Sequence, residues 1–239
     1  MEIGATDFDT ENAPSVGTLL GCCQGFIAAD KEASTVRLVH FTVQEYLCAH
    51  ADIFCKPHSI IAEACLTYLN SQQVKHLPSH PLPDHQIMPS LKCSSRYWGT
   101  HANSKPSDHA RTLALELLDQ YEDHVSTFSL FKQVLHLRHT EGLGASPCFS
   151  GLVCVSFFGI VEFVLALINA KGCEINKLDS PGNTPLFWAA DNGHDEVAKL
   201  LLEQGDADPN HPGVDSRTPI GCAALKGHEY ASRSRRCQS

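Results

Sequence analysis

Four side chains that could coordinate a metal lie close together in the sequence, at Cys48, His50, Cys55 and His58. Thiolates and imidazoles are common ligands of zinc. The spacing matches no known zinc finger, and on a helix Cys48 and His50 would point about 200° apart. Zinc therefore stays a minor alternative at this segment, and we expect no metal site.

Motifs for catalysis are absent from the sequence. Fourteen histidines and many serines make chance triads unavoidable. The sequence nevertheless contains neither the G-x-S-x-G turn of hydrolases nor the H-E-x-x-H motif of metalloproteases. It also lacks the G-x-x-x-x-G-K-[ST] loop that cradles nucleotide phosphates. We expect no enzyme activity, no catalytic residue and no cofactor.

The net charge and the cysteine pattern indicate which classes of partner the protein binds and in which compartment we expect it. Eighteen Lys and Arg against 27 Asp and Glu give a formal net charge of −9, which opposes binding to nucleic acid or to anionic membranes. Eleven scattered cysteines, without a C-x-x-C pair, favour reduced thiols over a disulfide framework. The segment Met1 to Val16 has four acidic residues and no apolar run, so we expect no secretory signal and a cytoplasmic protein.

One uncharged stretch, Gly142 to Val161, is long enough to raise the question of a membrane span. Ser146, Pro147 and Gly151 interrupt its first half. Its second half fits the repeat described next. We therefore predict a buried helix pair here and not a transmembrane helix.

A fixed period runs through the C-terminal third of the sequence. Thr184-Pro185 recurs as Thr218-Pro219, and Gly193-His194 recurs as Gly227-His228. Gly159 precedes Gly193 by the same interval. The period is 34 residues, and a constant period of this length is typical of a stack of similar supersecondary units.

Local chemistry predicts a turn and two helices in each unit. Asp179 to Asn183 is rich in turn-forming residues. Thr184 suits an N-cap, Pro185 the first helical position, and Gly193 a left-handed C-cap. The apolar stripe of the second helix comprises Val197, Leu200, Leu201 and Leu202.

These motifs resemble the ankyrin repeat: Gly182-x-Thr184-Pro185-Leu186, Ala189-Ala190, Gly193-His194 and Leu200-Leu201-Leu202. The resemblance implies a non-catalytic protein-binding array. Phe187 and Gly221 stand where the family usually has a histidine, so we expect the hydrogen bonds that join neighbouring turns to be absent.

The repeats at the two ends of the array are irregular. The first, Pro147 to Leu178, has Ser150-Gly151-Leu152 in place of Thr-Pro-Leu. The third begins at Thr218, but the sequence 231–236 replaces its second apolar stripe with serines and arginines. We expect about two and a half repeats and interpret the C-terminal end as truncated.

Upstream of the repeats, we predict short strands at Phe26 to Ala29 and Val36 to Val39, followed by helices. The predicted fold class is mainly α: a partial winged helix with a small β-hairpin, a helical linker region, then ankyrin-repeat helix pairs. The predicted regions are 1–70 (partial winged helix), 71–107 (proline-rich linker and short helix), 108–140 (helical linker) and 147–230 (repeats).

The segment Val36 to Leu47 resembles the end of the winged-helix subdomain that follows a NACHT nucleotide-binding domain. With the repeats, the chain resembles a fragment of the fungal NACHT and ankyrin-repeat proteins of the STAND class. The resemblance makes His40 the nucleotide-sensor position, facing the phosphates of ADP. Because the phosphate loop is absent, we expect His40 not to act as a sensor in this chain.

Three functional hypotheses remain. The first is a scaffold that binds another protein through exposed fingers near Asp179 to Asn183 and Pro212 to Ser216, and through the concave helix face. The second is the lid or sensor arm of a NACHT signalling switch that requires an upstream P-loop domain. The third is a remnant without function. The partner and the oligomeric state cannot be inferred from the sequence.

Overall fold

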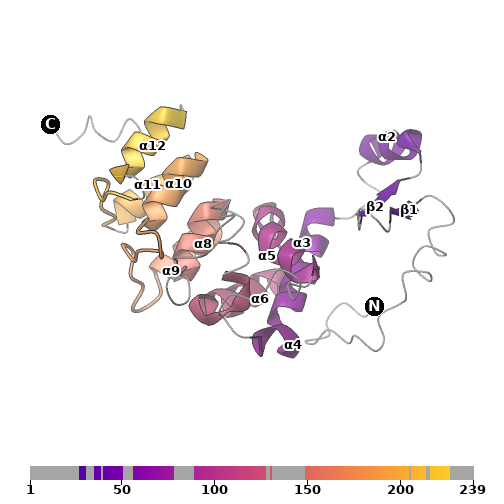
Figure 1. Ribbon diagram of the computed structural model, residues 1–239, viewed down its shortest axis with the longest axis horizontal. Helices are drawn as coiled ribbons and strands as arrows, with labels where there is room; N and C mark the ends of the chain where they lie inside the picture. Colours follow the sequence, from indigo (N-terminus) through magenta and orange to yellow (C-terminus); the bar gives the residue numbers. More distant parts are fainter. Residues whose placement is uncertain are drawn as a thin grey trace. The chain divides into compact units, whose positions relative to one another are not determined.

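The structure, a computed structural model, describes residues 27–30, 35–38, 40–50, 56–77, 89–127, 130, 149–204, 206–213 and 216–226 (Figure 1). The chain divides into two compact units, one formed by residues 8–57 and the other chiefly by residues 58–239. The described residues are mainly helical.

The smaller unit holds two strands and one helix among its described residues. Strand β1 (Ile27–Asp30) pairs with β2 (Thr35–Leu38) in antiparallel register, with Ile27 opposite Leu38. Helix α2 (Phe41–Ala49) follows directly. These elements do not by themselves show a winged helix, so that assignment stays a prediction.

Among its described residues, the larger unit begins with four helices and one 3₁₀ turn. They are α3 (Pro57–Asn70), α4 (Gln72–Lys75), α5 (Pro89–Ala102), α6 (Asp108–Asp119) and η3 (Tyr121–Asp123). Helix α5 is 14 residues long and begins at Pro89, within the region 71–107 that was predicted to be a proline-rich linker with a short helix. The sequence did not signal this start because Lys92, Cys93 and Ser94 form no apolar stripe. The last part of the predicted helical linker, residues 131–140, lies outside the described residues.

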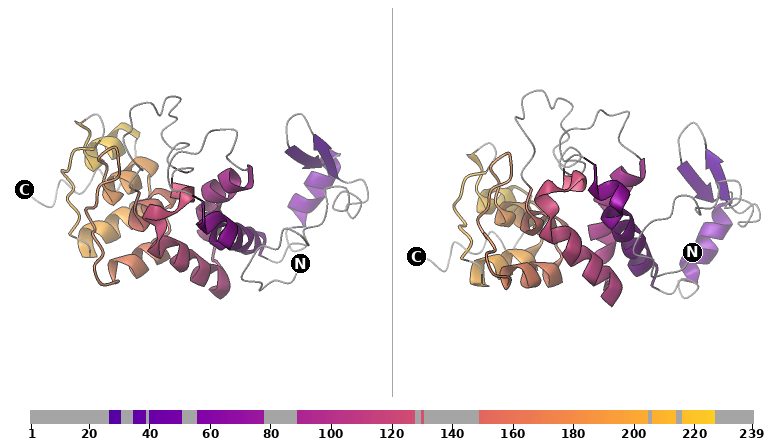
Figure 2. Two further views of the ribbon diagram at one scale, coloured as in Figure 1. Left: turned by 60° about the horizontal axis from the view of Figure 1, so that its bottom comes forward. Right: turned by 90° about the horizontal axis from the view of Figure 1, so that it is seen from below.

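The described part of the repeat region contains five helices in the predicted order. They are α8 (Gly151–Phe158), α9 (Val161–Ile168), α10 (Pro185–Asn192), α11 (Asp195–Gln204) and α12 (Pro219–Lys226). Helices α8, α10 and α12 form one layer, in which α10 contacts both of the others (Figures 1 and 2). Helices α9 and α11 contact each other in the second layer. The predicted helix pair of the first repeat is thereby confirmed.

In the described part of the uncharged stretch, residues 149–161, burial explains the lack of charge. Nearly every residue of α8 is buried, and Phe163 and Val164 of α9 are buried as well. Both helices are eight residues long. Within the described part of the chain, no helix has the length and apolarity needed to cross a membrane.

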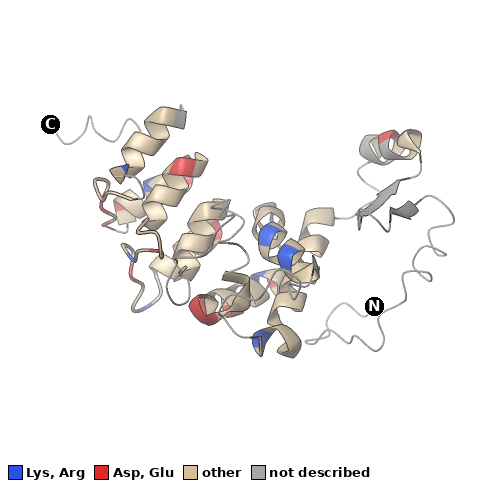
Figure 3. Ribbon diagram, in the orientation of Figure 1, with Lys and Arg blue, Asp and Glu red and all other residues tan. Residues whose placement is uncertain are grey.

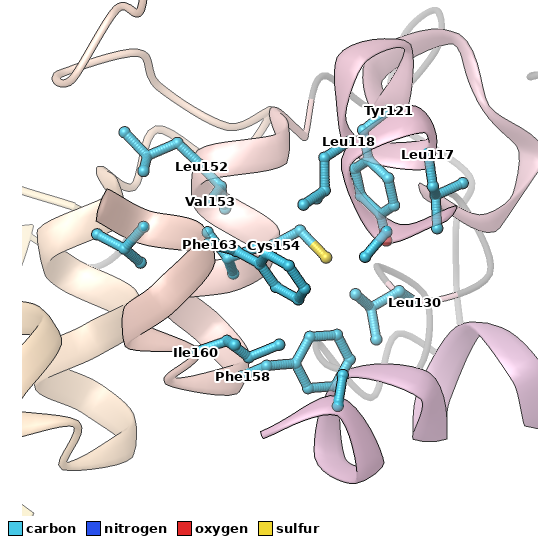
Figure 4. Packing of buried hydrophobic residues seen from close by; sticks show 14 of the residues in the cluster. Leu117, Leu118, Tyr121, Leu130, Leu152, Val153, Cys154, Phe158, Ile160 and Phe163 are labelled. Carbon is cyan, nitrogen blue, oxygen red and sulfur yellow. The ribbon is translucent and has the colours of Figure 1, made fainter. Parts of the chain in front are cut away.

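One hydrophobic core joins the helices before the repeats to the repeats themselves. It contains Leu66 of α3, Trp98 of α5 and Leu117 of α6, together with Val153 of α8 and Leu201 of α11. Figure 4 shows side chains of α6 and η3 facing those of α8 and α9 across this contact. Helices α5 and α6, which lie in the regions predicted as linkers, therefore contribute to this core.

Two glycines allow this packing to be close. A Cβ added at Gly99 of α5 would overlap the ring of Phe158, and one added at Gly151 would lie 2.7 Å from the carbonyl oxygen of Leu118. The ring of Trp98 meets that of Phe158 edge-on, with centroids 5.5 Å apart. Helix α3, assigned by sequence to the region ending at residue 70, also lies in the unit of the repeats.

Candidate protein-binding surface of the repeats

Hydroxyl side chains cap the inner helices of all three repeats, at equivalent positions of the period. Ser150 Oγ accepts a hydrogen bond from the Val153 amide, and Thr184 Oγ1 accepts one from the Phe187 amide at 3.1 Å. Thr218 Oγ1 accepts from the Gly221 amide at 3.2 Å. Each bond satisfies one of the free N–H groups at a helix start, so the three inner helices begin in the same way.

Glycines in the left-handed conformation end the first two inner helices. Gly159 has φ 72° and Gly193 has φ 73°, which confirms the predicted C-cap at Gly193. A residue with a side chain would be strained at this φ. The chain therefore turns sharply into the outer helix in both repeats.

His194 joins the second repeat to the first. Its Nε2 lies 2.9 Å from the carbonyl oxygen of Phe157 at the end of α8. Because a carbonyl oxygen only accepts, Nε2 carries the proton and donates it. The ring also lies so close to Gly159 that a Cβ at that position would overlap it. His194 thus satisfies a helix-end carbonyl of the neighbouring repeat.

A buried carboxylate organises the finger between α9 and α10. Asp179 Oδ1 accepts from the Asn183 amide at 2.6 Å, and Oδ2 accepts from Trp188 Nε1 at 2.7 Å. Burial raises the pKa of the Asp179 carboxyl, while the hydrogen bonds from Asn183 and Trp188 oppose this shift. Asp179 and Asn183 are therefore buried supports of the turn and not exposed contact residues.

The next finger repeats the backbone turn but not the carboxylate. The Asp179 amide donates to the Asn183 carbonyl, and at the equivalent position of the next repeat the Gly213 amide donates to the Arg217 carbonyl at 2.8 Å. Gly213 occupies the position of Asp179. A Cβ there would lie 2.8 Å from the ring of Phe187, so the missing side chain admits that ring.

Neighbouring fingers are joined without the family's usual histidine. Asn176 Nδ2 donates to the Asp206 carbonyl at 3.2 Å, and Asn176 Oδ1 accepts from the Asp208 amide at 3.0 Å. The expectation that hydrogen bonds between neighbouring turns are absent was wrong, because Asn176, at a different position of the repeat from the usual histidine, supplies them. Phe187, at the histidine position, instead packs towards the next finger at Gly213.

The fingers have exposed residues both within the ranges predicted from the sequence, such as Ser180, and directly beside them. Leu178 is 41% exposed although it is a large apolar side chain, and Glu174 and Asn176 are exposed nearby. On the second finger Pro212 and Ser216 are exposed, as predicted, and residues 214–215 lie outside the described residues. Figure 3 shows charges of both signs on the first finger, which carries Lys171, Glu174 and Lys177.

Ion pairs fix the repeats to the preceding helices. Arg111 of α6 pairs with Glu162 of α9, and Arg111 Nη1 lies 2.6 Å from Asp108. Lys177 Nζ lies 2.7 Å from Glu122, so the first finger is joined to η3. Both pairs are partly exposed to solvent, so each contributes little to the stability of the fold.

His40, the nucleotide-sensor position by resemblance, is exposed and caps helix α2. Its Nδ1 accepts from the Thr42 amide at 3.3 Å and from the Thr42 hydroxyl at 2.8 Å. Capping alone is a sufficient reason for a histidine at this position, because an imidazole nitrogen can accept a hydrogen bond from a free N–H at the helix start. The sensor role itself stays a prediction.

The structure describes only part of the four-residue group considered for zinc. His50 Nδ1 donates to the Tyr46 carbonyl at 2.9 Å, and Cys55 lies outside the described residues. His58 instead meets His101, with their Nδ1 atoms 2.8 Å apart. Sequence reasoning missed this pair because the two residues lie far apart along the chain. Across the described ranges, no three His, Cys, Asp or Glu side chains gather as a metal site.

Segments of the chain are similar to parts of much longer proteins. A segment of the chain is 40% identical to the transient receptor potential channel pyrexia of Drosophila melanogaster, over 34% of this chain and 8% of that protein. Another is 36% identical to the human ARF GTPase-activating protein GIT1, over 45% of this chain and 14% of that protein. The matched segment thus spans less than a sixth of either relative.

One solved structure, the yeast ribosomal protein Rps3 with its chaperone Yar1, aligns with 51% of this chain at 23% sequence identity and a TM-score of 0.35. A TM-score of this size does not establish a shared arrangement. The family model described as "Ankyrin repeats (3 copies)" matches residues 152–233, so this part of the chain carries ankyrin repeats.

Proposed function

We propose that this chain is a protein-interaction module whose repeats present the fingers and the inner helices to another protein. The observation that carries the proposal is a hydrogen-bonded stack with an apolar side chain held on its outside. Asn176 joins the two fingers, Asp179 holds the turn, and Leu178 between them is exposed. A pre-organised finger of this kind reduces the entropy lost on binding.

An affinity capture with two matched variants tests this function. Leu178→Glu places a charge on the exposed finger, whereas Lys199→Glu changes an exposed position of the outer helix α11. We expect the unaltered chain and Lys199→Glu to capture the same protein in equal amounts. Leu178→Glu should capture at least tenfold less of it. Circular dichroism of both variants checks that the helices are intact.

Equal capture by all three chains would contradict the proposal. The test is the difference between the amounts captured by Leu178→Glu and by Lys199→Glu. Capture alone is not sufficient, because exposed apolar residues such as Leu225 can bind proteins without specificity.

The finer part of the proposal is that the module belongs to a STAND signalling protein that also carries a NACHT domain. Its support is the resemblance of Val36 to Leu47 and the exposed position of His40 ahead of helix α2. On this proposal the chain alone gives no heat when ADP is titrated in a calorimeter. A longer chain with a P-loop domain would bind ADP, and His40→Ala would weaken that binding. Saturable ADP binding by the present chain would contradict the first expectation.

A further inference from the structure

Two imidazoles from different helices face each other on the surface of the larger unit. His58 is the second residue of α3, and His101 is the last but one of α5. Their Nδ1 atoms are 2.8 Å apart and their ring centroids 5.0 Å apart. His58 is exposed and His101 is half-buried, so solvent and dissolved ions reach the pair.

The two nitrogens lie close enough for one metal ion to bind both. Imidazole nitrogens bind first-row metals at about 2.0–2.1 Å. Two ligands at 90° around such a metal are about 2.9 Å apart, whereas two ligands at the tetrahedral angle are about 3.4 Å apart. The observed 2.8 Å is that of a hydrogen bond between the two rings, and replacing this bond by an ion requires the smallest movement of the rings when the two nitrogens take neighbouring positions at 90°.

A metal ion needs a free lone pair on each of the two Nδ1 atoms. In the metal-free protein one Nδ1–H donates to the other Nδ1. Coordination moves that proton to Nε2 of the same ring, which is a change of tautomer without net proton release.

We propose that His58 and His101 form a two-imidazole site for a divalent cation that favours square-planar nitrogen ligands, such as Ni²⁺ or Cu²⁺. Water completes the coordination, because no third metal-ligating side chain joins the pair among the described residues. The ion bridges the first turn of α3 and the last turn of α5. Binding to the folded state therefore stabilises this helix pair.

Calorimetric titration with Ni²⁺ tests the site, because Ni²⁺ does not oxidise the eleven cysteines as Cu²⁺ does. The variants are His58→Ala and His101→Ala. The control is His76→Ala, because His76 is also exposed but its Nδ1 donates to the Gln72 carbonyl of its own helix. We expect each of the first two variants to lose the same single Ni²⁺ equivalent, and the control to retain it.

A second measurement separates the site from the background of other histidines and thiols. Saturating Ni²⁺ raises the melting temperature of the unaltered chain and of His76→Ala, and we expect this shift to vanish in His58→Ala and in His101→Ala. The proposal is overturned if all four chains bind the same number of equivalents, or if the thermal shift survives the loss of either ring.

Discussion

His124 lies buried at the junction of α3 with the segment after η3, and its hydrogen bonds fix it in the neutral form. Nε2 donates to the Leu69 carbonyl at 3.0 Å, and Nδ1 accepts from the Ser126 amide at 3.2 Å. Protonation would remove the acceptor at Nδ1. Burial lowers the pKa of His124 from 6.5 to about 4, and nearby Lys75 acts in the same direction.

This depressed pKa predicts acid sensitivity. Between pH 6.5 and about 4 the unfolded chain binds a proton at His124 that the folded chain does not, so stability falls as the pH decreases. The loss contributed by this residue reaches about 3 kcal/mol below pH 4. Urea denaturation over this pH range measures it, with His124→Gln as the comparison. If the two chains lose stability in parallel over this range, His124 is not the cause.

Asp179 supports a second prediction at the scale of a residue. Asp179→Ala removes the acceptor of Trp188 Nε1 and of the Asn183 amide and leaves both donors buried. We expect a loss of about 2–4 kcal/mol in unfolding free energy, measured by urea denaturation. Asp179→Asn keeps one acceptor oxygen and should lose less. An equal loss in both variants would show that volume, and not hydrogen bonding, determines the effect.

Among the elements, the sharp turn between α8 and α9 depends on Gly159. It combines φ 72° with a position where a Cβ would overlap the His194 ring. Gly172 offers a matched control, because its φ is 85° and nothing lies within 4 Å of an added Cβ. Gly172→Ala should therefore cost only the conformational strain, about 1–2 kcal/mol.

We expect Gly159→Ala to cost clearly more than Gly172→Ala, because His194 must also move and its bond to Phe157 breaks. Thermal denaturation of both variants measures the difference. Similar melting temperatures for the two would mean that the His194 ring gives way without cost.

At the scale of the molecule, the shared core predicts that the helices before the repeats and the repeats unfold together. The two tryptophans of the chain report on the two parts, since Trp98 lies in α5 and Trp188 in α10. In the variant Trp98→Phe, the fluorescence of Trp188 reports the unfolding of the repeats. In the variant Trp188→Phe, the fluorescence of Trp98 reports the unfolding of the preceding helices.

Within each of these variants, we expect the fluorescence transition in urea to coincide with the loss of helix measured by circular dichroism. The physical reason is that Trp98, Phe158 and Leu118 belong to one continuous buried cluster. A fluorescence midpoint that differs from the helical midpoint would show two independent units and contradict the shared core.

The sequence by itself determined the repeats, because their signals are local. Thr184 and Gly193 mark the two ends of α10 through capping and backbone conformation, which depend on neighbours within a few residues. The regular period then extended the same assignment to α8 and to α12.

Only the tertiary structure decided which distant residues meet. It packs α5 and α6 against α8, where the sequence indicated linkers, because close approach depends on Gly99 and Gly151 facing particular partners. It also brings His58 of α3 to His101 of α5. Spacing along the chain carries no information about such contacts, since they arise from the way separate helices pack and not from any local pattern.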